Sequence, residues 1–176
     1  MKNSTLIAFA LLFVVVACNE SKKKTASASK EGVTTTYYLI RHAEKDRSDP
    51  SNGNPELTPE GIERARKWAQ YFENIKIDQI YSTDFSRTMQ TAAYVASQKQ
   101  VMIESYDPFD LYNENFKTLT KGSNVLVVGH SNTTPQFVNV IIEKDKYVDI
   151  PDDENGMLFM VTLANDTTNV QLFTVD

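Results

Sequence analysis

Residues 124–142, NVLVVGHSNTTPQFVNVII, decide the fold class. The run Val125–Val128 is uninterrupted, apolar and rich in valine, which is typical of a strand buried on both faces of a parallel sheet. A short loop over residues 129–134 follows, and Thr134 as cap predicts a helix over Pro135–Ile142. A buried strand that leads into a helix is the building unit of α/β domains.

Apolar runs of strand length alternate with segments of helical period in the rest of the chain. We predict further strands at Thr34–Arg41, Gln79–Tyr81, Val101–Ser105, Met157–Thr162 and Val170–Val175, the last two joined through Asn165-Asp166. We predict further helices from Pro59 behind the cap Thr58, at Phe85–Gln98 and at Glu114–Lys121. This alternation indicates a three-layer α/β domain with a mostly parallel central sheet and helices on both faces.

Composition excludes several classes of function. The chain has 176 residues and a formal net charge of −5, which suits one domain and argues against binding to nucleic acid. One cysteine allows no internal disulfide and no thiolate metal cage, and two histidines exclude a three-histidine zinc site. Composition thus excludes these two kinds of metal site.

The N-terminus has the pattern of an export signal. Lys2 precedes the uncharged apolar run Leu6–Ala17, which is too short for a membrane-spanning helix of about 20 residues. The run ends at Cys18 and resembles the lipobox of bacterial lipoproteins. The resemblance implies a signal peptide over residues 1–17, an acylated Cys18 that binds the lipid bilayer, and a location in the cell envelope, on the periplasmic or surface side. The alternative is a plain signal peptide with an unmodified cysteine.

A polar segment, residues 18–33, follows this signal. From Asn19 to Glu31 it has no apolar side chain larger than alanine, so we expect a flexible tether. The folded domain is then predicted over residues 34–176.

Histidine and arginine side chains follow the carboxyl ends of three predicted strands. The first strand ends in Arg41-His42, Arg87 follows the strand at Gln79–Tyr81, and His130 follows the strand at Val125–Val128. Ligands of open α/β sheets bind at the carboxyl ends of the strands. Both histidines of the chain are therefore predicted at one edge of the sheet.

Three motifs at these strand ends resemble those of the histidine phosphatase superfamily, which has the phosphoglycerate mutase-like fold. The motifs are Arg41-His42-Ala43-Glu44, the stretch from Ser82 to Ala92 with Arg87, and Gly129-His130-Ser131-Asn132. Their order and spacing agree with the family over about residues 37–176. The short chain resembles the compact branch, which includes small phosphohistidine phosphatases.

The resemblance implies a role for each motif residue. His42 would attack phosphorus, since a neutral imidazole is a good nucleophile near pH 7. Arg41 and Arg87 would bind phosphoryl oxygens with their planar forks, and His130 would add a donor on the opposite side. Asn132 would either reach the phosphate or cap the next helix. The resemblance implies that no metal and no cofactor is needed, because two arginines and a second histidine supply the positive charge.

The group that protonates the leaving group is less evident. Asp107 follows the strand at Val101–Ser105 and is the first choice, with Asp110 and Glu114 as alternatives. Asp107 could equally be a turn residue. Glu44 is expected to order its loop or to pair with an arginine. Arg47 lies in the long loop after the first strand, where it either recognises the substrate or, as we favour, is a solvated surface residue.

These observations lead to two functional hypotheses. The first is a membrane-anchored, metal-independent phosphomonoester phosphatase that acts on a small phosphorylated substrate through a phosphohistidine. The second is a non-catalytic lipoprotein of the envelope that binds a phosphorylated ligand. The sequence indicates no particular protein partner and does not identify the natural substrate.

Overall fold

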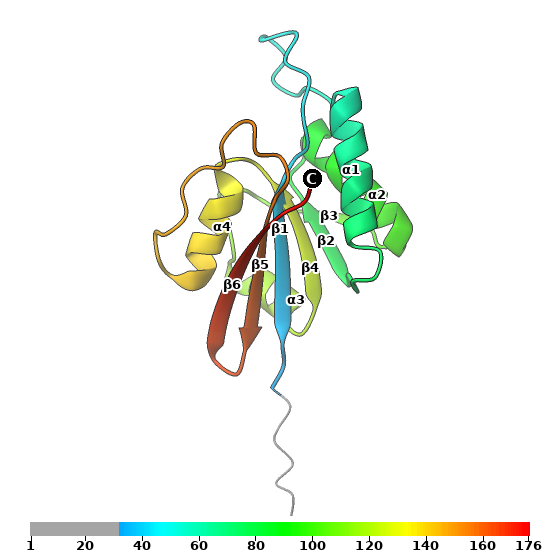
Figure 1. Ribbon diagram of the computed structural model, residues 1–176. Helices are drawn as coiled ribbons and strands as arrows, with labels where there is room; N and C mark the ends of the chain where they lie inside the picture. Colours follow the sequence, from blue (N-terminus) through cyan, green and yellow to red (C-terminus); the bar gives the residue numbers. More distant parts are fainter. Residues whose placement is uncertain (1–31) are drawn as a thin grey trace, which may run out of the picture. The chain divides into compact units, whose positions relative to one another are not determined.

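The strands and helices alternate as the hydrophobic pattern predicts, and they build one six-stranded sheet (Figure 1). The computed structural model describes residues 32–176. The strands are β1 Thr35–Arg41, β2 Gln79–Ser82, β3 Ile103–Ser105, β4 Asn124–Gly129, β5 Met157–Ala164 and β6 Thr167–Thr174. The helices are α1 Pro59–Tyr71, α2 Ser86–Lys99, α3 Glu114–Thr120 and α4 Thr133–Ile142.

The sheet has the strand order β3-β2-β4-β1-β5-β6. The first four strands pair in parallel, whereas β5 runs antiparallel to β1 and β6 antiparallel to β5. Asn165 and Asp166 both have positive φ angles, of 49° and 60°, at the two-residue turn between β5 and β6. Such a turn matches the twist of a hairpin, and Asn and Asp tolerate it well. The terminal strand pair is thus confirmed.

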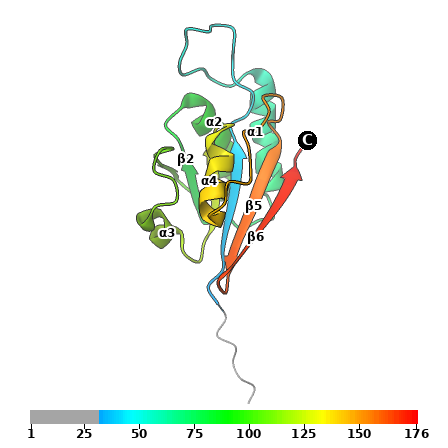
Figure 2. The ribbon, with the colours of Figure 1, turned by 90° about the vertical axis from the view of Figure 1, so that its left-hand side faces the viewer.

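Helices cover both faces of the sheet, as predicted (Figures 1 and 2). Successive side chains of β1 point to opposite faces, so Leu39 belongs to one core and Ile40 to the other. The core on the α1 and α2 face contains the fully buried Trp68 and Phe72. The opposite core includes Phe116 of α3 and Phe137 of α4. The three-layer architecture leaves the carboxyl ends of the parallel strands open to a ligand.

Several element boundaries differ from the predicted ones by one to three residues, and those of α4 and β3 have a clear physical reason. Helix α4 begins at Thr133 rather than Pro135, because Thr134 N already donates to His130 O at 3.0 Å. Asn132 takes the N-cap position without a side-chain capping bond. Strand β3 begins at Ile103 rather than Val101, because Val101 N still donates to Ala96 O at the end of α2.

The start of α1 carries a close approach that only glycine allows. Thr58 is the N-cap, as predicted, and its Oγ1 accepts from Gly61 N at 3.0 Å. A Cβ atom on Gly61 would lie 2.2 Å from the backbone oxygen of Glu44. The first turn of α1 therefore packs directly on the loop that follows β1.

Gly61→Ala is expected to destabilise the protein by about 1–3 kcal/mol, because the backbone of Glu44 must shift. The effect is opposite in sign to the usual gain of about 1 kcal/mol for this change inside a helix. Denaturant unfolding measures it. Gly53→Ala is the matched control, since its Cβ would meet nothing within 4 Å. Equal stability of the two variants would contradict the packing argument.

The predicted signal peptide, Cys18 and the tether up to residue 31 lie outside the described residues. Among residues 32–176, no helix is long and apolar enough to span a membrane.

Candidate active site

The register of β1 and β4 brings the two histidines together. Arg41 pairs with Gly129 in this parallel ladder, and His42 N donates to Gly129 O at 2.9 Å. The next residues, His42 and His130, therefore emerge side by side at the carboxyl edge of the sheet. Their ring centroids are 5.6 Å apart.

One cavity of about 360 Å³ gathers the predicted phosphate-binding residues. Arg41, His42, Arg87, His130 and Asn132 all line it. Lys45, Arg47 and Asp152, which belong to none of the three motifs, line it as well. The structure thus brings together the four principal residues predicted from the motifs, and it adds three charged side chains.

Hydrogen bonds around Ala43 set the orientation of His42. His42 Nδ1 donates to Ala43 O at 2.7 Å, which leaves Nε2 as the nitrogen with a free electron pair. Ala43 N donates to Thr91 Oγ1 at 2.9 Å, and Thr91 Oγ1 donates to Arg87 O. The spacing of Arg87 and Thr91 in the second motif is therefore explained by one helical turn that holds the loop after His42.

Both histidines are neutral near pH 7. Burial lowers the pKa of His42 to about 3, against the effect of the bond to Ala43 and with help from the charge of Arg41. Burial also lowers the pKa of His130 to about 4, and the charges of Arg87 and Lys45 contribute. A neutral His42 is the nucleophilic form.

A chain of hydroxyl groups determines the tautomer of His130. Thr88 Oγ1 donates to a carbonyl, that of Thr83 or of Phe85, both 2.8 Å away. It must therefore accept from Thr83 Oγ1 at 2.9 Å, so Thr83 in turn accepts from His130 Nε2 at 3.0 Å. The proton of His130 lies on Nε2, and Nδ1 faces Arg87 Nη2 at 3.4 Å as an acceptor.

Thr83→Val is expected to remove this tautomer preference and to lower kcat/KM for an aryl phosphate about tenfold, the equivalent of one hydrogen bond. Nitrogen NMR of the imidazoles measures the tautomer directly, and the two histidines of the chain make assignment simple. Thr118→Val on exposed α3 is the control. An unchanged His130 spectrum in Thr83→Val would contradict the hydroxyl chain.

Arg87 has donor groups free for a ligand. Its Nε and Nη1 are buried and have no hydrogen-bond partner within residues 32–176. The guanidinium lies 4.2 Å from the centroid of the Phe85 ring, which holds it in place. Unpaired buried donors are costly, so this group is arranged for an anion.

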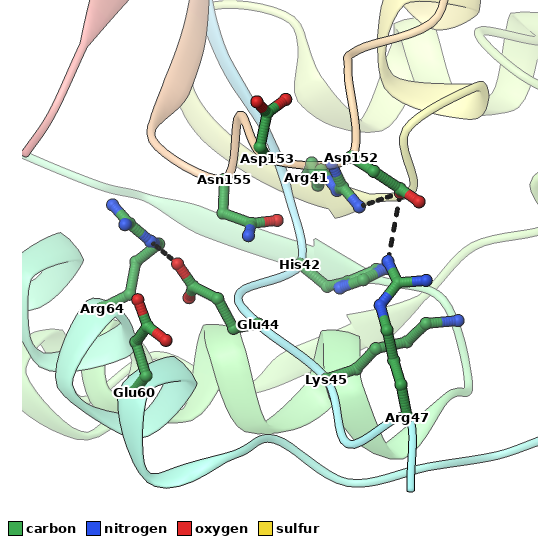
Figure 3. Close-up of a pocket in the computed structure, with 10 residues that line it drawn as sticks. All are labelled: Arg41, His42, Glu44, Lys45, Arg47, Glu60, Arg64, Asp152, Asp153 and Asn155. Carbon is green, nitrogen blue, oxygen red and sulfur yellow. Dashed lines mark hydrogen bonds and ion pairs between the residues drawn. The ribbon is translucent and has the colours of Figure 1, made fainter. Parts of the chain in front are cut away.

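Arg41 is held by the loop before β5. Its Nη1 donates to Pro151 O at 2.6 Å, and its Nη2 pairs with Asp152 Oδ1 at 3.0 Å. Arg47 reaches the same oxygen at 3.1 Å (Figure 3). Its side chain is 56% exposed, as expected of a surface arginine, and the pair with Asp152 is a contact that the sequence did not indicate. The pair with Arg41, assisted by Arg47, lowers the pKa of Asp152. No motif singled out Asp152, which stands in an ordinary polar run of the sequence.

The predicted proton donor does not reach the cavity. Asp107 is exposed, accepts from Phe109 N at 2.8 Å and lines a different pocket. Asp110 lines the pockets on that side, and Glu114 pairs with Lys117 on α3. The position of Asp107 thus does not support its role as the proton donor. It is the position of a turn residue, which was the alternative role expected for Asp107.

Glu44 pairs with an arginine, as one of its two expected roles required. Its Oε1 accepts from Arg64 Nε at 2.6 Å, and Figure 3 shows this pair on the side of His42 away from Asp152.

Among the described residues, no group of three or more His, Cys, Asp or Glu side chains could hold a metal ion.

Part of the chain matches a known protein family. The model of the histidine phosphatase superfamily (branch 1) matches residues 37–110. No curated protein sequence matches the chain.

Solved structures match over most of the chain. A protein histidine phosphatase SixA complexed with tungstate has a TM-score of 0.61 at 17% identity, covering 79% of this chain and 96% of its own. Phosphoglycerate mutase from Bacillus anthracis has a TM-score of 0.62 at 14% identity, covering 81% and 94%. A phosphoserine phosphatase from Entamoeba histolytica, in complex with phosphoserine, has 0.58 at 15%, covering 78% and 95%. The match over residues 37–110 confirms the family resemblance there, and the chain has the phosphoglycerate mutase-like fold.

Proposed function

We propose that the chain is a phosphomonoester phosphatase that works through a phosphohistidine on His42. One observation carries the proposal: His42, with Nε2 free, shares a cavity with His130, Arg41 and Arg87. A neutral nucleophile, two guanidinium groups and a second imidazole are what transfer of a phosphoryl group to nitrogen requires.

The reaction follows from the positions of these groups. His42 Nε2 forms a bond to phosphorus while the ester P–O bond breaks, and the leaving oxygen departs on the opposite side. Arg87 and Arg41 bind the equatorial oxygens, whose charge the transition state spreads. Water then attacks the phosphohistidine, and inorganic phosphate leaves. His130 Nδ1, which faces Arg87 Nη2 at 3.4 Å as an acceptor, is placed to receive a proton from that water.

The tautomer of His130 determines which leaving groups depart readily. Because its proton lies on Nε2 and points to Thr83, His130 Nδ1 has no proton to donate. Asp107 lies outside the cavity. Leaving groups of low pKa therefore depart as anions, and alkyl phosphates react more slowly.

Release of p-nitrophenol from p-nitrophenyl phosphate tests the activity. Hydrolysis is expected to continue in EDTA, because Arg41 and Arg87 supply the positive charge. Vanadate is expected to inhibit competitively, since it forms the five-coordinate geometry of the transition state. Absence of hydrolysis and of vanadate binding would contradict the proposal.

The pH profile follows from the lowered pKa values of the histidines. Each histidine is neutral above its folded-state pKa, so the active form persists from pH 7 down to about pH 4. After correction for ionisation of the substrate, kcat/KM should be flat over that range and fall only below it. A tenfold fall per pH unit starting near the ordinary histidine pKa of about 6.5 would contradict it.

A second candidate is a phospho-ligand-binding protein without turnover. It is favoured by the position of Asp107, because no predicted proton donor lines the cavity. Rapid mixing with p-nitrophenyl phosphate distinguishes the two. A burst of one p-nitrophenol per protein followed by no steady rate supports the binding function, whereas continuous release supports the phosphatase.

We also propose that the chain is anchored to a membrane of the cell envelope through acylated Cys18. The support is the apolar run Leu6–Ala17 that ends at the single cysteine. Envelope glycan phosphates or scavenged phosphomonoesters are the substrates that suit this location. Cys18→Ala is expected to move the protein from the membrane to the soluble fraction, and an unchanged distribution would contradict the anchor.

A further inference from the structure

Lys45 is a half-buried cation without a partner. It lines the cavity with His42, yet no hydrogen bond or ion pair involves its ammonium group in the part of the chain that the structure describes. Figure 3 shows it beside Arg47. Each of the other lining cations, Arg41, Arg47 and Arg87, contacts another side chain.

The backbone holds Lys45 in this position. Its residue forms an isolated bridge with Leu57, and on either side Thr58 N donates to Glu44 O and Asp46 N to Glu56 O. Leu57 N in turn donates to the side chain of Gln90 on α2 at 2.8 Å. The backbone of Lys45, three residues after His42, is thus fixed by hydrogen bonds on both sides.

The side chains that line the cavity carry more positive charge than one phosphoryl group can neutralise. Four cations and one carboxylate line it, which gives +4 − 1 = +3 with both histidines neutral. A phosphomonoester brings at most two negative charges, so a net positive charge remains.

Lys45 lies among the other positive charges of the cavity. Burial lowers its pKa, and Arg87, Arg47 and Arg41 lower it further while only Asp152 opposes them. Lys45 also lines the adjoining cavity, which Glu44, Glu60 and Asp153 line as well, but within residues 32–176 none of these carboxylates pairs with its ammonium group.

We infer that Lys45, with Arg47, binds a second anionic group of the substrate. The substrate class is a phosphomonoester whose leaving group carries a carboxylate or a further phosphate. This inference rests on the proposed phosphatase function, because it assumes that Arg41, Arg87 and the histidines bind the phosphoryl group. The second anion would occupy the side of the cavity where Arg47 now pairs with Asp152.

Length-matched phosphate esters test the second site. Phosphoglycolate is compared with ethyl phosphate, and 3-phosphooxypropanoate with propyl phosphate, as competitive inhibitors of p-nitrophenyl phosphate hydrolysis. In each pair the carboxylated ester is expected to bind at least about fivefold more tightly, equal to about 1 kcal/mol. Lys45→Gln should reduce that preference to below about twofold, and Lys45→Arg should retain most of it. Lys67→Gln, on the exposed side of α1, should leave the preference at the wild-type value.

The outcomes separate this inference from the proposed function. Equal inhibition by the members of both pairs in the wild type would overturn the second site, as would a preference that survives Lys45→Gln. Loss of the preference in Lys67→Gln would assign it to net charge and also overturn the site. If the wild type does not hydrolyse p-nitrophenyl phosphate, the phosphatase proposal fails, and calorimetric binding of the same pairs decides the second site alone.

Discussion

His42→Ala is expected to lower the rate of p-nitrophenyl phosphate hydrolysis by about 10⁴-fold or more. Removal of a covalent nucleophile leaves only binding and charge stabilisation, and knockouts of this kind have effects of that order. In this protein no other side chain of the cavity offers a neutral nitrogen with a free electron pair and no bound partner, because His130 Nδ1 faces Arg87. Steady-state kinetics with purified protein measure the loss.

The control for His42→Ala is a measurement that the variant still folds. His42 is only 4% exposed, so its removal leaves a small cavity, and thermal unfolding must show that the variant still folds. Vanadate should still stabilise the variant through Arg41 and Arg87. A folded variant with more than about a tenth of wild-type activity would exclude His42 as the nucleophile.

Arg87→Lys is expected to lower kcat/KM about 10²–10³-fold although the charge is kept. Lysine is a point charge and cannot present two parallel donors to phosphoryl oxygens. The buried Nε and Nη1 of Arg87, which have no partner within residues 32–176, are the donors that would be lost. The comparison of kcat/KM between wild type and variant measures the effect.

Arg66→Lys is the matched control for this change. Arg66 lies on the exposed side of α1 and pairs with Glu63, so its replacement should change kcat/KM less than about twofold. If Arg87→Lys were equally mild, the planar fork of Arg87 would have no part in binding the transition state.

The fold could be predicted because its signals are local. The apolar run of β4, the Thr58 cap of α1 and the Asn165-Asp166 turn each determine structure within a few residues. The start of α4 differs from the prediction because His130 O already accepts from Thr134 N, a bond that no local pattern in the sequence reveals.

The principal site residues could be predicted for a related reason. Arg41 and His42 end β1, and His130 follows β4, so their placement needs only the rule that parallel strands share one edge. Asp152, by contrast, reaches Arg41 from a loop 111 residues away. Lys45 and Thr83 acquire their roles from the charges and hydroxyl groups packed around them, which are tertiary contacts.

The position of Asp107 outside the cavity has a specific cause. Asp107 does follow a strand end, but β3 is the edge strand and is separated from β1 by β2 and β4. With strands about 4.8 Å apart, that places β3 roughly 14 Å from β1. Strand order is a long-range property that alternation along the chain does not specify, so the rule of strand ends placed Asp107 on the correct edge but at the wrong distance.

Detection of the phosphoenzyme tests the central claim most directly. Wild-type protein is mixed with radiolabelled phosphate ester, quenched in alkali within milliseconds and digested. A phosphoramidate on His42 that is stable in alkali and labile in acid, and that forms and decays as fast as the steady-state turnover, is the predicted result. Steady release of phosphate with no label on His42 at any time would show that water attacks the substrate directly, and it would contradict the phosphohistidine mechanism.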